Sequence, residues 1–155
     1  MSEESLKLVK LNYKLFLDDI RQPGDCFRIT GQSVFLDTDW VIVRDYNQFV
    51  DVVSERYLEY SFPNIVAFDH DLASEHYVDN FVDLDSYKNF TEKTGYHCAK
   101  WLIDFCIDKE LPLPTYYCHS MNPAGKENIL SLFKSYKCSD CNCEGYHSPS
   151  CTKNV

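Results

Sequence analysis

The sequence lacks several features that would place the protein in a common class. No run of about 18 uncharged apolar residues occurs, so no membrane-spanning helix is expected. The N-terminal residues MSEESLKLVK lack the apolar stretch of a secretory signal peptide. A nucleophile elbow, a Walker A loop and a dinucleotide-binding glycine motif are also missing. We therefore expect a cytoplasmic protein that uses none of those three chemistries.

Basic residues are scarce. The chain has 155 residues, with 15 Lys and Arg against 24 Asp and Glu, and a net charge of −9. This excess of negative charge repels nucleic-acid backbones, so we expect no long nucleic acid as a partner. The length and the 45% hydrophobic content fit one globular domain.

Cysteine, with eight residues, is in excess. In a chain without a secretion signal, thiols are expected to be reduced and to serve as core residues or metal ligands. Four of them are scattered and are interpreted as core thiols: Cys26, Cys98, Cys106 and Cys118. The other four crowd into residues 138–151, and this split separates a domain at 1–137 from a tail at 138–155.

The tail is similar to a zinc knuckle. Its spacing, Cys138-x2-Cys141-x5-His147-x3-Cys151, covers the same 14 residues with the histidine displaced by one, and Cys143 competes as a ligand. Thiolates with one imidazole suit tetrahedral Zn²⁺, so one hypothesis is a zinc clip that stabilises the end of the domain. The alternative is a reactive tail without metal.

Hydrophobic periodicity predicts an α/β fold, because apolar runs alternate with stretches of helical spacing. Strands are expected at 14–20, 40–46, 64–72 and 115–120, and helices at 47–60, 94–110 and 123–136. Residues 21–25, which contain Pro-Gly, are expected to be loop, and residues 73–93 an insertion or lid. Right-handed crossovers favour a flavodoxin-like, doubly wound parallel sheet of about four strands in the order 2-1-3-4.

Polar residues follow three of these strands and should converge at the carboxyl edge of the sheet. They are Asp18-Asp19, Asp69-His70-Asp71 and His119-Ser120. Carboxylates so close together repel one another, and a hard divalent cation removes the repulsion. We predict that Asp18, Asp19 and Asp69 hold Mg²⁺ or Mn²⁺, which prefer oxygen ligands. The alternative is that single aspartates cap turns or helices.

Histidines and helix starts add phosphate chemistry. We predict that His119 donates a proton to a leaving oxygen and that His70 or Asp71 activates water. The alternative for each histidine is a hydrogen-bonded structural role, and that role is expected for His97. Two predicted helix starts offer backbone N–H groups and a positive dipole end to a phosphate. The residues concerned are Thr94, Gly95, Asn122 and Gly125, with Lys126 as a nearby cation or a solvated surface residue.

Four segments together resemble one family. LFLDDIR (15–21), FDHDL (68–72), TGYHCAKWL (94–102) and HSMNPAGKENI (119–129) are similar to the cyclic-phosphate processing receiver-like (cREC) family, which is related to response-regulator receiver domains. The resemblance covers roughly residues 13–136 and implies a receiver-like fold whose acidic pocket processes cyclic phosphates. By position, Asp18 and Asp19 match the metal-binding pair of receivers, Asp69 the phosphoacceptor and His119-Ser120 the switch residue. No fifth strand with the receiver lysine is visible, which argues against a phosphorelay.

The leading hypothesis is a metal-dependent phosphoesterase for a cyclic nucleotide or an RNA-end cyclic phosphate, with His70, Asp71, His119 and Ser120 as catalytic residues. The alternative is a binding module, either a non-catalytic adaptor or a sponge for a cyclic nucleotide. A small anionic phosphate is the expected partner in both cases. The resemblance also suggests a phage origin, which would place the protein in the host cytoplasm. The lid aromatics either stack on a base or form a satellite core: Tyr77, Phe81, Tyr87 and Phe90.

Overall fold

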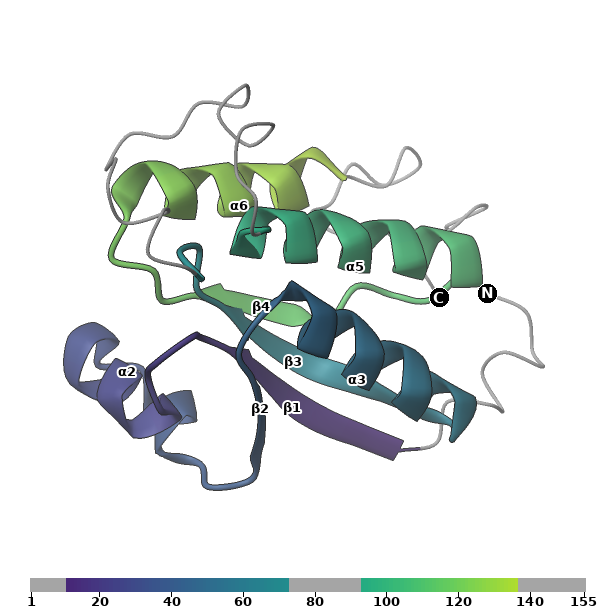
Figure 1. Cartoon of the computed structure of the whole chain (residues 1–155), viewed down its shortest axis with the longest axis horizontal. Helices are drawn as coiled ribbons and strands as arrows, with labels where there is room; N and C mark the ends of the chain where they lie inside the picture. The colour runs from purple at the N-terminus through teal and green to yellow at the C-terminus, as the bar shows by residue number, and fades with distance from the viewer. Residues whose placement is uncertain (1–10, 73–92, 137–155) are drawn as a thin grey trace.

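The computed structural model describes residues 11–72 and 93–136, which form a four-stranded parallel sheet with helices on both faces. The strands are β1 (Leu11–Leu17), β2 (Trp40–Val43), β3 (Ser61–Phe68) and β4 (Thr115–Cys118). The helices are α2 (Pro23–Thr30), the 3-10 helix η1 (Ser33–Leu36), α3 (Tyr46–Leu58), α5 (Gly95–Lys109) and α6 (Pro123–Ser135). The strand order β2-β1-β3-β4 confirms the predicted receiver-like topology (Figure 1).

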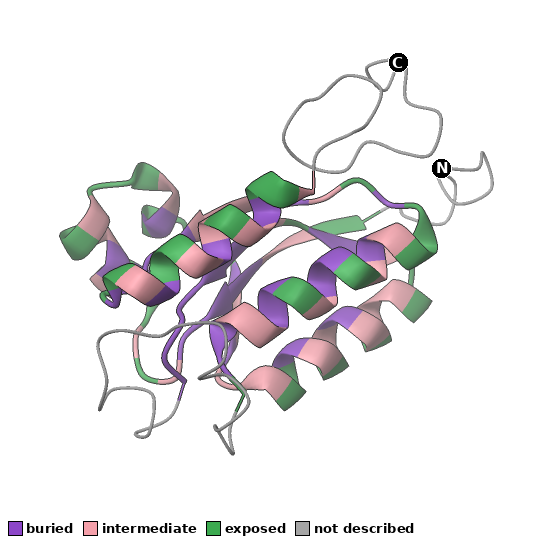
Figure 2. Ribbon diagram, turned by 90° about the horizontal axis from the view of Figure 1, so that it is seen from above, coloured by how far each residue is buried: buried purple, intermediate pink, exposed green. Residues whose placement is uncertain are grey.

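Alternating side chains of the strands build two cores. In β1, Leu15 and Leu17 belong to the larger core under α3, α5 and α6, while Phe16 points to the opposite face. That second, smaller core contains Cys26 of α2 and Phe35 of η1. Figure 2 shows α3, α5 and α6 lying side by side, with their buried residues turned toward the sheet.

The four scattered cysteines are free and buried, which confirms their interpretation as core thiols. Cys98 and Cys106 lie on the inner face of α5, and Cys118 ends β4. Burial raises the pKa of Cys26, Cys106 and Cys118 to about 12, so these groups stay protonated at neutral pH.

The loop prediction for residues 21–25 is wrong, because α2 begins at Pro23. Proline is favoured in the first turn of a helix, where its missing N–H would have no partner in any case. The Gln22 N–H donates to Oδ2 of Asp25 at 3.0 Å, which closes a capping box around that turn. The Pro-Gly pair therefore starts a helix here, and the short helix is held by Cys26 in the smaller core.

Candidate functional site

Three chain segments meet in one row at the carboxyl edge of the sheet. Asp18, Asp69 and His119 each follow the last residue of a strand. Their main-chain N–H groups extend the parallel ladder: Asp18 donates to the Val43 carbonyl at 3.1 Å, Asp69 to Leu17 at 2.9 Å and His119 to Phe68 at 3.0 Å. The ladder thus places residues that are about 50 positions apart along the chain next to one another.

Asp18, which follows β1 at one end of this row, is fully buried. Its Oδ1 atom accepts from the backbone N–H groups of Ile20 at 3.0 Å and Arg21 at 2.8 Å. Its Oδ2 atom is 3.0 Å from Nε2 of His119 and 3.7 Å from the Arg21 guanidinium. Burial by itself raises the pKa of Asp18, but the bonds from His119 and the backbone outweigh it, and the net pKa lies below the usual value. Asp18 is therefore an anion in the folded protein.

Asp69 has the opposite electrostatic state. Its Oδ1 atom accepts from the His70 N–H at 2.8 Å, whereas its Oδ2 atom is buried without a hydrogen-bond partner among the described residues. Burial and the nearby charge of Asp18 raise the pKa of Asp69 to about 8. A bound cation would relieve both effects, because it supplies opposite charge and a partner for the orphaned oxygen.

Three aspartates at the site form a cluster that suits a divalent cation. One ligand atom each from Asp18, Asp19 and Asp69 fits within 4.8 Å of the others, and Asp19 is half-buried, so one side of the cluster remains open to solvent. These are hard oxygen ligands, as Mg²⁺ and Mn²⁺ prefer. A second set shares Asp18 and adds Cys26 and His119 within the same limit. The structure thus brings the predicted ligands together, and the binding of Mg²⁺ or Mn²⁺ there stays a prediction.

His119 is held rigidly between aromatic rings. Its imidazole stacks on Phe16 with the ring centroids 4.7 Å apart and the planes 3° apart, and it meets Phe35 edge-on. Burial lowers the pKa of His119, partly offset by Asp18, so the ring is neutral at pH 7. In the neutral form the Nε2–H donates to the ionised Asp18, which leaves Nδ1 as an acceptor. Nδ1 is buried and has no partner among the described residues.

His70 and Asp71 form a separate pair beside α6. Nδ1 of His70 is 2.8 Å from Oδ1 of Asp71, and the Asn122 amide donates to the same oxygen at 3.3 Å. The His70 ring is fully buried and lies so close to Gly125 that a Cβ there would stand 2.3 Å from its Cγ. These contacts tie the end of β3 to the start of α6. A catalytic role for this pair stays a prediction.

The backbone N–H groups predicted to bind phosphate have partners inside the protein. Gly95 donates to the His70 carbonyl at 2.9 Å, and Gly125 donates to Oδ1 of Asn122 at 3.0 Å. The Thr94 N–H donates to Nδ1 of His97 at 2.9 Å, which gives His97 the structural role expected of it. The helices cap themselves because each start carries its own acceptor side chain. Phosphate binding at these N–H groups therefore stays a prediction.

An arginine holds the loop of the acidic cluster, and it was not predicted from the sequence. Nη1 of Arg44 donates to the main-chain carbonyls of Asp18 at 3.0 Å and Arg21 at 2.7 Å. Arg44 directly follows β2, and this position at a strand end, after the run WVIV, is the sequence feature that could have indicated a place near the site. Because β2 pairs with β1, an arginine at this point faces the loop that carries Asp18 and Asp19.

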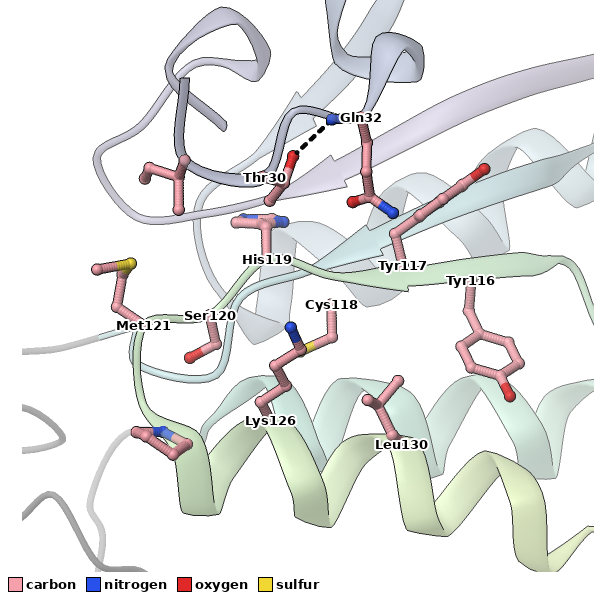
Figure 3. Close-up of a pocket in the computed structure, with 12 residues that line it drawn as sticks. Thr30, Gln32, Tyr116, Tyr117, Cys118, His119, Ser120, Met121, Lys126 and Leu130 are labelled. Atoms are coloured by element: carbon pink, nitrogen blue, oxygen red, sulfur yellow. Dashed lines mark hydrogen bonds between the residues drawn. The ribbon is translucent and has the colours of Figure 1, made fainter. Parts of the chain in front are cut away.

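A groove of about 710 Å³ opens beside the acidic cluster, between α2, β4 and α6 (Figure 3). Of the residues predicted for the site, His119, Ser120 and Lys126 line it. Lys126 extends from α6 toward His119 in Figure 3, and its charge lowers the pKa of that imidazole. The lysine therefore brings a positive charge into the groove.

Two sets of predicted residues lie outside the described parts of the chain. They are the aromatic residues of the lid at 73–93, among them Tyr77 and Tyr87, and the tail ligands Cys138, Cys141, His147 and Cys151. The lid and zinc hypotheses keep the status of predictions. Among the described helices, none has the length and apolar composition needed to span a bilayer.

Comparison with known proteins identifies the family of this chain. A family model described as the cyclic-phosphate processing receiver domain matches residues 13–135. No curated protein and no solved structure gave a match. The matched region contains the sheet apart from the first two residues of β1, together with the acidic cluster and both buried histidine–aspartate pairs. The chain belongs to the cyclic-phosphate processing receiver domain family.

Proposed function

We propose that the protein is a metal-dependent phosphoesterase that hydrolyses a cyclic phosphate ester. The observation that carries this proposal concerns Oδ2 of Asp69, which is buried next to the anionic Asp18 at the carboxyl edge of the sheet and has no hydrogen-bond partner among the described residues. Membership of a cyclic-phosphate processing family supports the same class of ligand. A chain of net charge −9 needs a local positive charge before a phosphate can approach its carboxylates.

Asp18, Asp19 and Asp69 would hold Mg²⁺ or Mn²⁺. When bound, the ion supplies a positive charge that attracts the phosphate and stabilises charge developing on its oxygens. Hydrogen bonds within the protein hold the aspartates that follow β1 in position. His119 and two backbone N–H groups bind the Asp18 carboxylate, and Arg44 binds the main chain of the loop that follows β1. These bonds hold the ligand oxygens in place before any ion arrives.

The proton transfers are assigned to His119. The oxygen of a water molecule bonds to phosphorus, one ring P–O bond breaks, and the product is an acyclic phosphate monoester. Nδ1 of His119 accepts the water proton and returns it to the leaving ester oxygen, so the imidazole ends neutral. The sequence predicted only that His119 donates a proton to the leaving oxygen. Because the Nε2–H is bound to Asp18, the other nitrogen, Nδ1, must first accept the proton that it later donates. Lys126 offsets the charge of the phosphate from the groove side.

The test is incubation of the purified protein with a panel of cyclic mononucleotides and Mg²⁺ or Mn²⁺, followed by chromatography. We expect conversion to monoesters, and a loss of at least about 100-fold in rate for Asp69→Asn and His119→Asn. The matched control is Asp104→Asn, which removes one exposed carboxylate from α5 and should keep full activity. Full activity in both site variants would contradict the mechanism.

A binding module is the second candidate. It is favoured by the near-complete burial of the reacting groups, since Asp69 is 2% exposed and His119 is 1% exposed. In that case the same incubation returns the cyclic mononucleotide intact after the protein is denatured. Recovery of intact ligand in stoichiometric amount, with no monoester formed, would replace the enzyme assignment by this one.

A further inference from the structure

The groove beside the acidic cluster differs in charge from the rest of the molecule. The chain has 24 acidic residues against 15 basic ones, yet among the described residues no carboxylate lines this groove. Its charged side chain is Lys126, and its rim carries exposed apolar residues, Ile29 at 45% and Met121 at 62% exposure. Its volume lies within the range of small-molecule sites. A groove of this kind suits an anion that also has an apolar, flat part.

The groove joins the acidic cluster through His119. This residue lines the groove, and its Nε2 atom is 3.0 Å from Asp18. Beside it, Ser120 accepts from the Asn122 N–H at 3.1 Å, so its hydroxyl proton can donate to a phosphate oxygen. Figure 3 shows Lys126 and Ser120 on opposite sides of this end of the groove, so a phosphate there would meet a hydroxyl and an ammonium group.

The far end of the groove suits a heterocyclic base. Tyr117 projects from β4 toward Gln32, and Leu130 of α6 closes the other wall (Figure 3). Within the described part of the chain, β4 pairs only with β3. Because the His119 N–H points toward β3, strand alternation turns the N–H and carbonyl of Cys118 toward the groove. The floor thus presents a donor and an acceptor next to an aromatic ring.

We propose that this groove binds the nucleoside of a free cyclic mononucleotide, with the base against Tyr117 and the phosphate between Ser120 and Lys126. The inference takes the cyclic phosphate of the ligand from the proposed function, whereas the base site is argued from the groove alone. The three residue-to-residue steps from Tyr116 to His119 cover about 10 Å of extended chain, a length that one nucleotide spans. An RNA end is disfavoured, because further phosphates would meet a strongly acidic protein.

The test measures binding without a divalent ion, so it does not depend on turnover. Protein-observed NMR titration in EDTA at low salt compares 3′,5′-cyclic AMP, 2′,3′-cyclic AMP and 3′,5′-cyclic GMP with ribose 5-phosphate, which has no base. At least one nucleotide should bind about fivefold or more tightly than ribose 5-phosphate, the gain expected from stacking on an aromatic ring. Lys126→Gln should weaken all of these ligands about threefold. Lys134→Gln, an exposed lysine in the last turn of α6 that does not line the groove, should change nothing.

Tyr117→Leu separates base recognition from simple charge attraction. It should remove the preference for nucleotides over ribose 5-phosphate while leaving the binding of ribose 5-phosphate unchanged. Equal binding of all ligands by the wild type, or an equal loss for all ligands in Tyr117→Leu, overturns the inference. Tighter binding of an oligonucleotide that ends in a cyclic phosphate also overturns it. The predicted pattern without turnover in Mg²⁺ or Mn²⁺ supports the inference and contradicts the proposed enzyme activity.

Discussion

Substitution of Gly95 by alanine tests how the acidic cluster is built. Gly95 begins α5, and its N–H donates to the His70 carbonyl at 2.9 Å. A Cβ at this position would lie 1.7 Å from the Asp69 carbonyl oxygen and 2.8 Å from its carbonyl carbon. Both atoms belong to the backbone, so no side-chain rotation relieves the overlap. Helix α5 has to move away from the strand end that carries Asp69.

The magnitude follows from three contributions. Overpacking costs about 1–3 kcal/mol. Stretching or breaking the buried bond to the His70 carbonyl costs about 1–3 kcal/mol. Alanine recovers at most about 1 kcal/mol in helix propensity. We therefore expect Gly95→Ala to lower the free energy of unfolding by about 3 kcal/mol, which for a domain of this size lowers Tm by about 6–12 °C.

The assay is urea and thermal unfolding followed by circular dichroism, with Gly24→Ala as the control. Gly24 lies in the first turn of α2, and a Cβ there meets no atom within 4 Å, so this variant should match the wild type or be slightly more stable. Displacement of Asp69 should also weaken Mn²⁺ binding in Gly95→Ala, measured by calorimetry. Equal stability of the two variants within about 0.5 kcal/mol would refute the close approach of α5 to β3.

Three further predictions concern the charged groups and the thiols. In metal-free protein, the pKa of Asp69 is about 8 in the folded state and near 4 in the unfolded chain, so the folded state binds the proton more tightly. The free energy of unfolding should therefore fall as the pH rises through this range, by at most about 1.4 kcal/mol per pH unit. Chemical denaturation across that range should show a flatter profile for Asp69→Asn, and a persistent fall in this variant would exclude Asp69 as its source. Arg44→Gln removes hydrogen bonds to two loop carbonyls, so it should lower the free energy of unfolding by about 1–3 kcal/mol and weaken Mn²⁺ binding. Arg28→Gln, on the exposed side of α2, should change neither the stability nor Mn²⁺ binding. Alkylation at pH 8 followed by mass spectrometry should leave four buried thiols unmodified until the protein unfolds, and rapid labelling of any of them in the native state would contradict their burial: Cys26, Cys98, Cys106 and Cys118.

The fold was predictable from hydrophobic patterning because both periods are strong in this chain. The apolar runs ending at Leu17 and Phe68 identify β1 and β3, and the stripe along α5 identifies the helix between β3 and β4. The short helix α2 was not predictable in this way, since it buries only Pro23 and Cys26 and begins at a Pro-Gly pair. Its helical state depends on the smaller core, which no local pattern reveals.

The location of the site could be predicted from the sequence, whereas the hydrogen-bond partners of its residues could not. Asp18, Asp69 and His119 follow strand ends, so topology alone brings them together. The partner of each group was not predictable, because hydrogen bonds such as that from His119 to Asp18 join residues 101 positions apart. Arg44 was missed for the same reason, since it holds carbonyls on a neighbouring strand's loop.

Hydrophobic patterning was enough to predict the order of the strands, the parallel sheet and the edge at which the polar residues meet, because periodicity and crossover handedness leave few alternatives. Three properties became visible only in the folded chain: which groups are charged, which nitrogen of His119 is an acceptor, and why positions 95 and 125 are occupied by glycine. Those properties depend on burial and on contacts between distant segments. The same dependence locates the groove, since its walls come from α2, β4 and α6.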